Sequence, residues 1–261
     1  MNRMPLALLI ALLIATVMTT TEPVGVARAE SDLQQAQEIF REANAGFAAG
    51  HFQESAERFR ALLDQGWISA ALLYDLANAE SRAGRAGWAV LYYERALALA
   101  PRDADIRANL EQTREGAGLL APERSRWEEL ARSATTDEWA ALALAALWIA
   151  AGICVARAVR PSAAPSLPTA GRAIVGLLCI VALSSASLAR DRSRQMERAI
   201  VVEPAPALRA APFEEATTST QLDSGDEVEL ERIHGGFALV RTDAGEAGWV
   251  PTPLVIRIVP D

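Results

Sequence analysis

The sequence predicts a multi-domain membrane protein that combines helical hairpins, two transmembrane helices and a small all-β barrel. Three observations carry this prediction: a pattern that recurs in the first half of the chain, two apolar segments without charge in the middle, and short alternating segments separated by turns near the end. The chain has 261 residues, which is enough for two small domains with additional segments. Its hydrophobic content of 51% is high for a soluble protein, and the excess is concentrated in three apolar stretches.

The first apolar stretch has the features of a secretory signal. Arg3 precedes an apolar run from Leu6 to Val17, and Ala27, Arg28 and Ala29 fit the small-x-small pattern of a cleavage site. We therefore predict that residues 1–29 are a signal peptide cleaved after Ala29. An uncleaved membrane anchor is the alternative.

Residues 30–120 contain a pattern that recurs after about 34 residues, the spacing of tetratricopeptide repeats. The recurring residues are Ala43, Asn44, Ala45, Gly50 and Phe59 in one copy and Ala77, Asn78, Ala79, Gly84 and Tyr93 in the other. The pattern predicts two tetratricopeptide helical hairpins over residues 36–101, followed by a capping helix from Asp103 to Gly116. Two and a half units are marginal for stability, so we expect contacts with the membrane, a second copy or a partner.

The first helix of each predicted hairpin lines the concave face, where we expect a partner-binding groove. Aromatic rings supply apolar area there, and amide groups can bond the backbone of a bound peptide. The predicted groove residues are Phe40, Asn44, Phe47, Tyr74, Asn78 and Ser81. Packing of Phe40 and Tyr74 between the units is the alternative. The predicted groove lacks the basic residues that hold a C-terminal carboxylate in chaperone-binding relatives, so a free C-terminus is not the expected ligand.

The middle of the chain predicts two membrane spans. Residues 121–138 form a juxtamembrane linker, residues 139–156 and 173–189 are the predicted transmembrane helices, and residues 157–172 connect them. Neither span contains a charged residue, and the segment Trp139–Trp148 lacks the polar stripe of a soluble helix, although both spans are near the lower length limit of a membrane span.

The distribution of arginine predicts how these spans are oriented. The loop between them carries Arg157, Arg160 and Arg172 without an acidic residue, and positively charged loops remain in the cytoplasm. Further arginines after the second span, from Arg190 to Arg198, oppose this assignment. We expect a protein of the bacterial cytoplasmic (inner) membrane with both soluble domains facing the periplasm.

Residues 190–261 change to a strand pattern after a short linker. Val228 and Leu230 alternate with glutamates, and turn glycines separate further apolar runs, which predicts about five short strands in a small barrel. The segment Gly245–Pro251 resembles the Gly-Trp-Val turn of bacterial SH3-like domains. The resemblance implies that Trp249 packs on the barrel rather than contacting a ligand.

The order of these parts resembles the aerotolerance (Bat) family, specifically its E-type member. The segments Phe40–Asn44, Leu91–Leu97 and Asp137–Trp139 are similar to sequence segments of that family. The resemblance implies a non-enzymatic scaffold that acts with von Willebrand A-type membrane proteins and a MoxR-type ATPase in envelope stress or oxygen tolerance. A peptidoglycan-binding regulator of a cell-wall enzyme, acting through the SH3-like domain, is the alternative.

The sequence offers no pattern for catalysis, a cofactor or a metal. The net charge of −8 argues against nucleic-acid binding, which requires clustered cations. His51 and His234 fall in predicted turns of different domains, and no phosphate-binding loop occurs. Cys154 and Cys179 are expected to be buried apolar residues, with a redox pair as the alternative. Glu227, Glu229 and Glu231 are interpreted as one solvated face of a strand.

Overall fold

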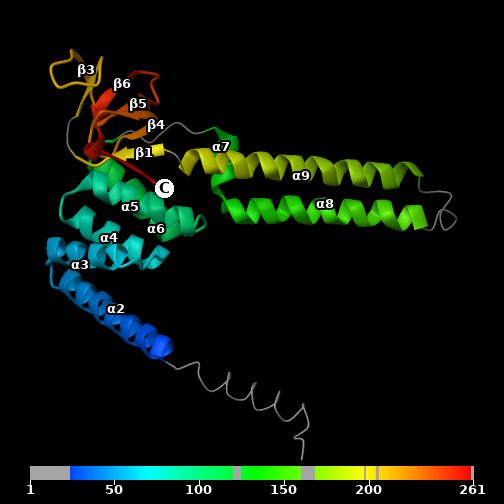
Figure 1. The fold of residues 1–261 in the computed structure, drawn as a ribbon, viewed down its shortest axis with the longest axis horizontal. Helices are drawn as coiled ribbons and strands as arrows, with labels where there is room; N and C mark the ends of the chain where they lie inside the picture. Colours follow the sequence, from blue (N-terminus) through cyan, green and yellow to red (C-terminus); the bar gives the residue numbers. More distant parts are fainter. Residues whose placement is uncertain (1–23, 120–124, 160–167, 197, 204–205, 260–261) are drawn as a thin grey trace, which may run out of the picture.

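The computed structural model describes residues 24–119, 125–159, 168–196, 198–203 and 206–259, and these contain eight α-helices and a seven-stranded antiparallel sheet. Figure 1 shows a stack of short helices with the sheet on one side, and a long helical hairpin that projects from this body. The helices are α2 (Val24–Ala48), α3 (Phe52–Asp64), α4 (Ala70–Arg82), α5 (Ala86–Leu99), α6 (Ala104–Gly116), α7 (Arg126–Arg132), α8 (Thr136–Val159) and α9 (Pro168–Met196).

The recurring glycines end equivalent helices of the stack. Gly50 follows α2 with φ +85°, and Gly84 follows α4 with φ +78°, a conformation that favours glycine. Each amide bonds back into the helix, from Gly50 to the Phe47 carbonyl and from Gly84 to the Ser81 carbonyl, both at 3.0 Å. The chain therefore turns at the same point of each recurring unit.

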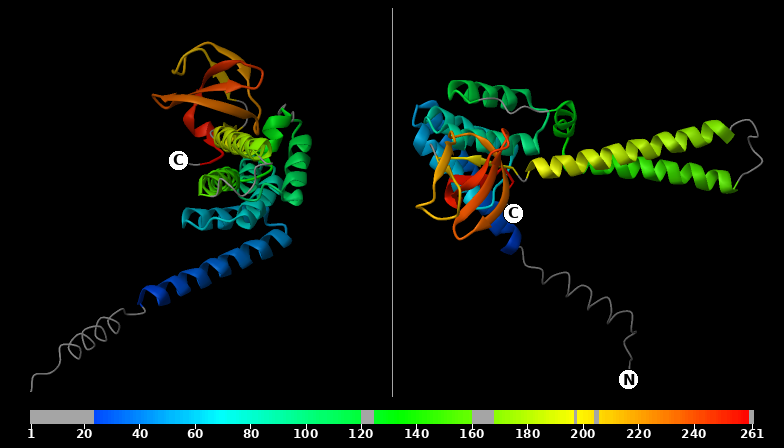
Figure 2. Two further views of the ribbon diagram at one scale, coloured as in Figure 1. Left: turned by 90° about the vertical axis from the view of Figure 1, so that its right-hand side faces the viewer. Right: turned by 90° about the horizontal axis from the view of Figure 1, so that it is seen from above.

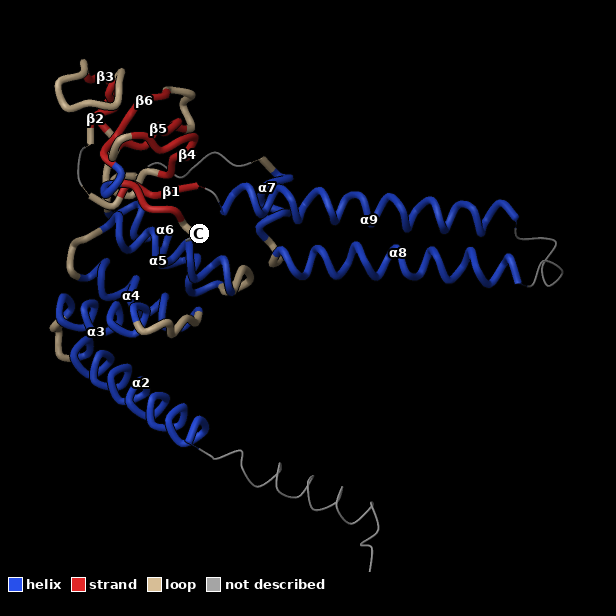
Figure 3. The backbone as a smooth tube through the Cα atoms, in the orientation of Figure 1, coloured by secondary structure: helices blue, strands red, loops and turns tan. Residues whose placement is uncertain are grey.

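The recurring apolar residues form the core of the stack. Phe59 and Tyr93 occupy equivalent positions in α3 and α5, and both are almost completely buried. Ala43 and Ala77 are fully buried, which is expected where small residues let helices approach closely. Consecutive helices from α2 to α6 pack on one another, as the tube in Figure 3 shows. The helical pairs agree with the predicted pattern, while their assignment to the tetratricopeptide repeats stays a prediction.

Helices α8 and α9 run side by side in opposite directions, away from the stack (Figure 2). Small residues dominate the contact between them, which allows close packing. The buried residues are Ala143, Ala146 and Ala150 on α8 and Ala182, Ser185 and Leu188 on α9. Of the described helices, only Thr136–Val155 within α8 is long and apolar enough to cross a membrane, whereas the apolar part of α9, Ile174–Arg190, is shorter. The predicted second span over residues 173–189 thus stays a prediction.

The C-terminal region contains seven strands in the order β3-β2-β6-β5-β4-β1-β7. Their bounds are β1 Arg198–Val201, β2 Ala207–Arg209, β3 Thr218–Gln221, β4 Glu227–His234, β5 Phe237–Thr242, β6 Ala247–Pro251 and β7 Val255–Arg257, with a 3-10 turn over Thr252–Leu254. Leu208, Val240 and Val250 are fully buried on the inner face. The strand pattern predicted fewer strands, and the SH3-like assignment stays a prediction.

The sheet packs directly on the helical stack, although the two regions are separated in sequence by the hairpin. Ile200, Val202 and Ile258 belong to the same apolar core as the buried residues of α3–α6. On α5, the Arg95 guanidinium donates hydrogen bonds to the carbonyls of Ile258 at 2.7 Å and Arg257 at 2.9 Å. The stack and the sheet therefore form one body.

A buried group of charges lies where α5, α6, α7 and the sheet meet. Arg114 donates to Glu94 at 3.0 Å and forms an ion pair with Glu227 at 3.5 Å, while Arg132 also binds Glu94. Arg198 binds Glu227 at 3.1 Å. The prediction of a solvated face is consequently wrong for Glu227, whose side chain is only 3% exposed because Arg114 of α6 and Arg198 of the neighbouring strand β1 cover it.

Two further predicted segments, the signal peptide and the juxtamembrane linker, are described only in part. Residues 1–23 of the predicted signal peptide lie outside the described residues, and α2 runs without a break through Ala29, where cleavage was predicted. The predicted linker contains helix α7, which begins with a capping box between Ser125 and Glu128. This helix had no counterpart in the sequence-based prediction.

Candidate functional site

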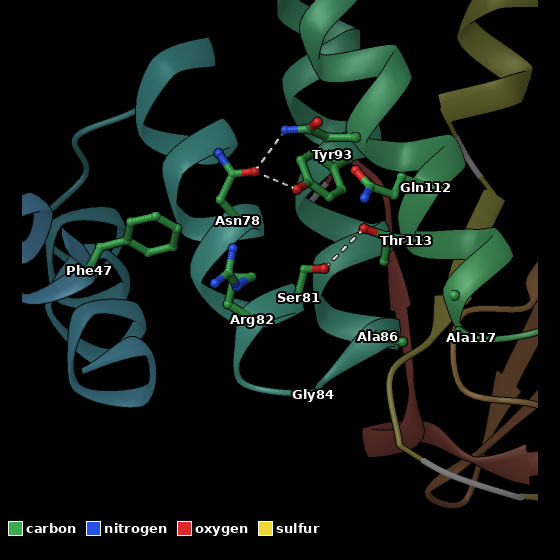
Figure 4. A pocket seen from close by; sticks show the side chains of 12 residues that line it. Phe47, Asn78, Ser81, Arg82, Gly84, Ala86, Tyr93, Gln112, Thr113 and Ala117 are labelled. Carbon is green, nitrogen blue, oxygen red and sulfur yellow. Dashed lines mark hydrogen bonds between the residues drawn. The ribbon is translucent and has the colours of Figure 1, made fainter. Parts of the chain in front are cut away.

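The candidate site is a cavity of about 600 Å³ between α4 and α6 (Figure 4). Phe47, from the end of α2, lies across the cavity from α6. Polar side chains dominate the two helical walls. They are Asn78, Ser81 and Arg82 on α4 and Asn109, Gln112 and Thr113 on α6.

The floor of the cavity is a connected set of hydrogen bonds. The Tyr93 hydroxyl donates to Oδ1 of Asn78 at 2.6 Å, and Nδ2 of Asn109 donates to the same oxygen at 3.0 Å. Nδ2 of Asn109 also donates to the Tyr74 hydroxyl at 2.9 Å. Burial raises the pKa of Tyr93 to about 12, so this hydroxyl keeps its proton at neutral pH. The Asn78 amide is therefore held in one orientation, with its Nδ2 group not used by any hydrogen bond within the described part of the chain.

The rim of the cavity carries a cation. The guanidinium of Arg82 lies 4.9 Å from the centre of the Phe52 ring, a geometry that stabilises a positive charge. Within the residues that the structure describes, no carboxylate forms an ion pair with Arg82. Beside it, the Ser81 and Thr113 hydroxyls are 3.1 Å apart and connect α4 to α6. The site thus combines a fixed amide, hydroxyl groups, an aromatic ring and a positive charge.

The structure divides the six predicted groove residues. Phe47, Asn78 and Ser81 line the cavity, and Tyr74 lies behind its floor, bonded to Asn109. Tyr74 also packs against Tyr93, with ring centroids 6.1 Å apart.

Phe40 and Asn44 have structural contacts instead. The Phe40 ring on α2 packs edge-on against Phe59 on α3 at 5.5 Å, which is a contact within the first helical pair and not the packing between units that the alternative expected. Asn44 donates from Nδ2 to the Phe40 carbonyl at 3.2 Å. It also contacts Asp75, whose pKa is raised by burial and lowered in part by the Asn44 hydrogen bond. Neither residue is among those that line the cavity.

The sequence reasoning missed the wall that α6 provides. The helix Asp103–Gly116 is predicted only as a cap, but it continues the recurring pattern and occupies the position that the first helix of a third unit would have. Its residues Asn109, Gln112 and Thr113 therefore line the cavity. The sequence reasoning also missed Arg82, which directly follows the predicted Ser81.

The other residues considered from sequence do not come together. Cys154 is exposed on α8 and Cys179 is partly buried on α9, so the expectation of two buried thiols is wrong for Cys154. His51 precedes α3, and His234 ends β4, 6.5 Å from the half-buried ring of Trp249. No group of metal-binding side chains occurs within the described residues.

Comparison with known protein families, with curated proteins and with solved structures finds no match to this chain.

Proposed function

We propose that this chain is a membrane-anchored, non-enzymatic binding protein whose helical stack holds an extended segment of a partner protein. The observation that carries the proposal is the pre-oriented Asn78 amide beside Arg82, a cation without a carboxylate partner among the described residues. An amide can donate to a peptide carbonyl, and a guanidinium can bind a carboxylate side chain. Phe47 adds an apolar surface on the opposite side of the cavity.

The dimensions of the site support a peptide rather than a folded domain. A cavity of about 600 Å³ is within the usual range for ligand pockets and accommodates a few residues. Because the floor is already held by Tyr93 and Asn109, little side-chain ordering remains when a ligand binds.

The hairpin supports the membrane part of the proposal. Large apolar side chains cover its outer surface. Exposing them to water is unfavourable in free energy, whereas contact with lipid is not. The exposed residues are Leu142, Leu144, Leu147, Trp148, Ile149 and Val155 on α8 and Ile174, Leu177, Ile180 and Leu183 on α9. The 20-residue span in α8 corresponds to about 30 Å, the thickness of the hydrocarbon core.

The contact between stack and sheet constrains the topology. The stack precedes α8 and the sheet follows α9, yet Arg95 joins them directly. If the hairpin crosses the membrane, both must lie on the same side, which requires two crossings. The arginine-rich loop favours the periplasm for this body, where a von Willebrand A-type membrane protein is the partner that the family resemblance supports.

Site-specific photo-crosslinking in living cells tests the binding site. A photoreactive residue in place of Gln112, which lines the cavity, is expected to capture a partner protein. The matched control replaces Glu111, its exposed neighbour on α6 outside the cavity. Asn78→Ala should abolish the adduct formed at position 112. Equal adducts at both positions, or none at position 112, would contradict the proposal.

Reporter fusions test the topology separately. A reporter placed after Asp261 is expected to be active only outside the cytoplasm. A cytoplasmic signal would show that the orientation derived from the arginines is wrong.

A further inference from the structure

Helix α7 carries two exposed apolar side chains on one face. Trp127 is 45% exposed and Leu130 is 44% exposed, and residues three apart lie next to each other on a helix. Arg132 lies on the opposite side of the helix and binds Glu94, while Ala131, which is next to Trp127 at i+4, is fully buried. The helix thus has an inner face that belongs to the body and an outer apolar face with no partner among the described residues.

The position of α7 is fixed by contacts at both ends. Ser125 accepts a hydrogen bond from the Glu128 amide at 3.2 Å, and Glu128 accepts one from the Ser125 amide at 2.7 Å. Near the C-terminal end, the Ala131 carbonyl accepts a hydrogen bond from Nε1 of Trp139 on α8 at 3.0 Å. Helix α7 also packs on α9, at the end of the hairpin that adjoins the body (Figure 1). It therefore lies at the level where α8 begins.

We propose that the Trp127 and Leu130 face of α7 rests on the membrane surface, at the boundary between lipid headgroups and acyl chains. This inference depends on the proposed insertion of the hairpin. Through the bond from Trp139, helix α7 adjoins the start of α8, whose first exposed large apolar residue is Leu142. Tryptophan favours this boundary because its ring is apolar and its N–H is polar.

A lipid surface fits this face better than a protein partner does. Two side chains are too few for a specific protein interface, which buries about 1,000 Å² or more. Two inserted apolar side chains next to an anchored hairpin need only adjust its depth and tilt. Arg126 and Glu129, both exposed on the same short helix, can reach the polar headgroups. The contact would hold the body, and with it the cavity between α4 and α6, at a set height above the bilayer.

Spin labelling of the full chain in vesicles of phosphatidylcholine and phosphatidylglycerol tests this inference. Cys154→Ala and Cys179→Ala remove the native thiols, and Leu130→Cys provides the label site. Accessibility to oxygen and to a water-soluble nickel chelate is measured at this site and at three controls. Leu144→Cys reports the lipid interior, Ala108→Cys reports water at the exposed surface of α6, and Glu129→Cys reports a neighbouring direction on α7.

The label at position 130 is expected to gain oxygen accessibility and lose nickel accessibility relative to position 108, without reaching the values of position 144. Position 129 should be more accessible to nickel than position 130. If position 144 is in lipid while positions 130 and 129 are as accessible to nickel as position 108, the membrane contact of α7 is refuted and the anchored hairpin stands. If position 144 is itself in water, the proposed insertion fails, and the contact fails with it.

Discussion

Replacing Gly87 by alanine is expected to separate the sheet from the helical stack. Gly87 lies in the first turn of α5, and a Cβ atom there would be 2.4 Å from Oγ of Ser224, 2.6 Å from the Val201 carbonyl oxygen and 2.9 Å from Cα of Val202. The serine side chain can rotate away, but the two backbone atoms belong to Val201, the last residue of β1, and to Val202, which follows it. Restoring an ordinary contact with the Val201 oxygen requires a movement of about 0.8 Å.

The magnitude follows from what this movement disturbs. Overpacking of a well-packed core costs about 1–3 kcal/mol. The same displacement would lengthen the hydrogen bonds from Arg95, now 2.7 and 2.9 Å, beyond their useful range. Gly116→Ala is the matched control, because this glycine is also helical and a Cβ there meets no heavy atom within 4 Å. The control should gain up to about 1 kcal/mol of helix stability.

Amide hydrogen exchange of the full chain in lipid nanodiscs measures the effect where it is expected. The Val201 amide, bonded to the Asp226 carbonyl at 3.0 Å, reports the docked β1 strand. A loss of about 1–3 kcal/mol corresponds to about 5- to 150-fold faster exchange when exchange follows the opening equilibrium. Unchanged exchange in Gly87→Ala, or equal acceleration in Gly116→Ala, would refute the reasoning.

Three further changes test the core, the buried charges and one carboxyl group. Phe59→Ala should cost about 3–5 kcal/mol because the ring is fully buried, whereas Phe213→Ala, at a half-exposed ring, should stay within about 0.5 kcal/mol; equal shifts in thermal unfolding would contradict this. Glu94→Gln leaves Arg114 with a weaker buried partner and should cost about 3–5 kcal/mol in denaturant unfolding, and no loss would show that the pair contributes nothing. Burial raises the pKa of Asp75, so the stability linked to this group is present at low pH and decreases as the pH rises through the raised value. Asp75→Asn should therefore raise Tm at pH 7, with the gain disappearing near the ordinary aspartate pKa of about 3.9; a gain independent of pH would contradict the assignment.

The parts of the fold that could be predicted are those with a local signal. Gly50 and Gly84 end helices, Phe59 and Tyr93 fill equivalent core positions, and the absence of charge identifies the apolar part of α8. These features depend on residues a few positions apart, so their spacing reveals them.

The docking of the sheet on α5 has no such signal. The alternation around Glu227 correctly indicates a strand, but it cannot show that Arg114 and Arg198 cover that carboxylate. Only part of the cavity could be predicted, because its second wall also depends on packing between helices and not on a local pattern. Ser81 and Asn78 belong to a recurring helix, whereas the contribution of Thr113 depends on where the next helix packs.

The contact between α5 and β1 also orders events during synthesis. Leu99 ends α5 and Arg198 begins β1, so the surface of α5 around Val90 has no cover until both hairpin helices have been made. At about 5–20 residues per second, synthesis of the residues between these two positions takes about 5–20 s. During that time an apolar surface outside the ribosome depends on a chaperone or on the membrane for protection. The sheet, which is synthesised after the hairpin, therefore completes the apolar core of the helical stack, which is synthesised before it.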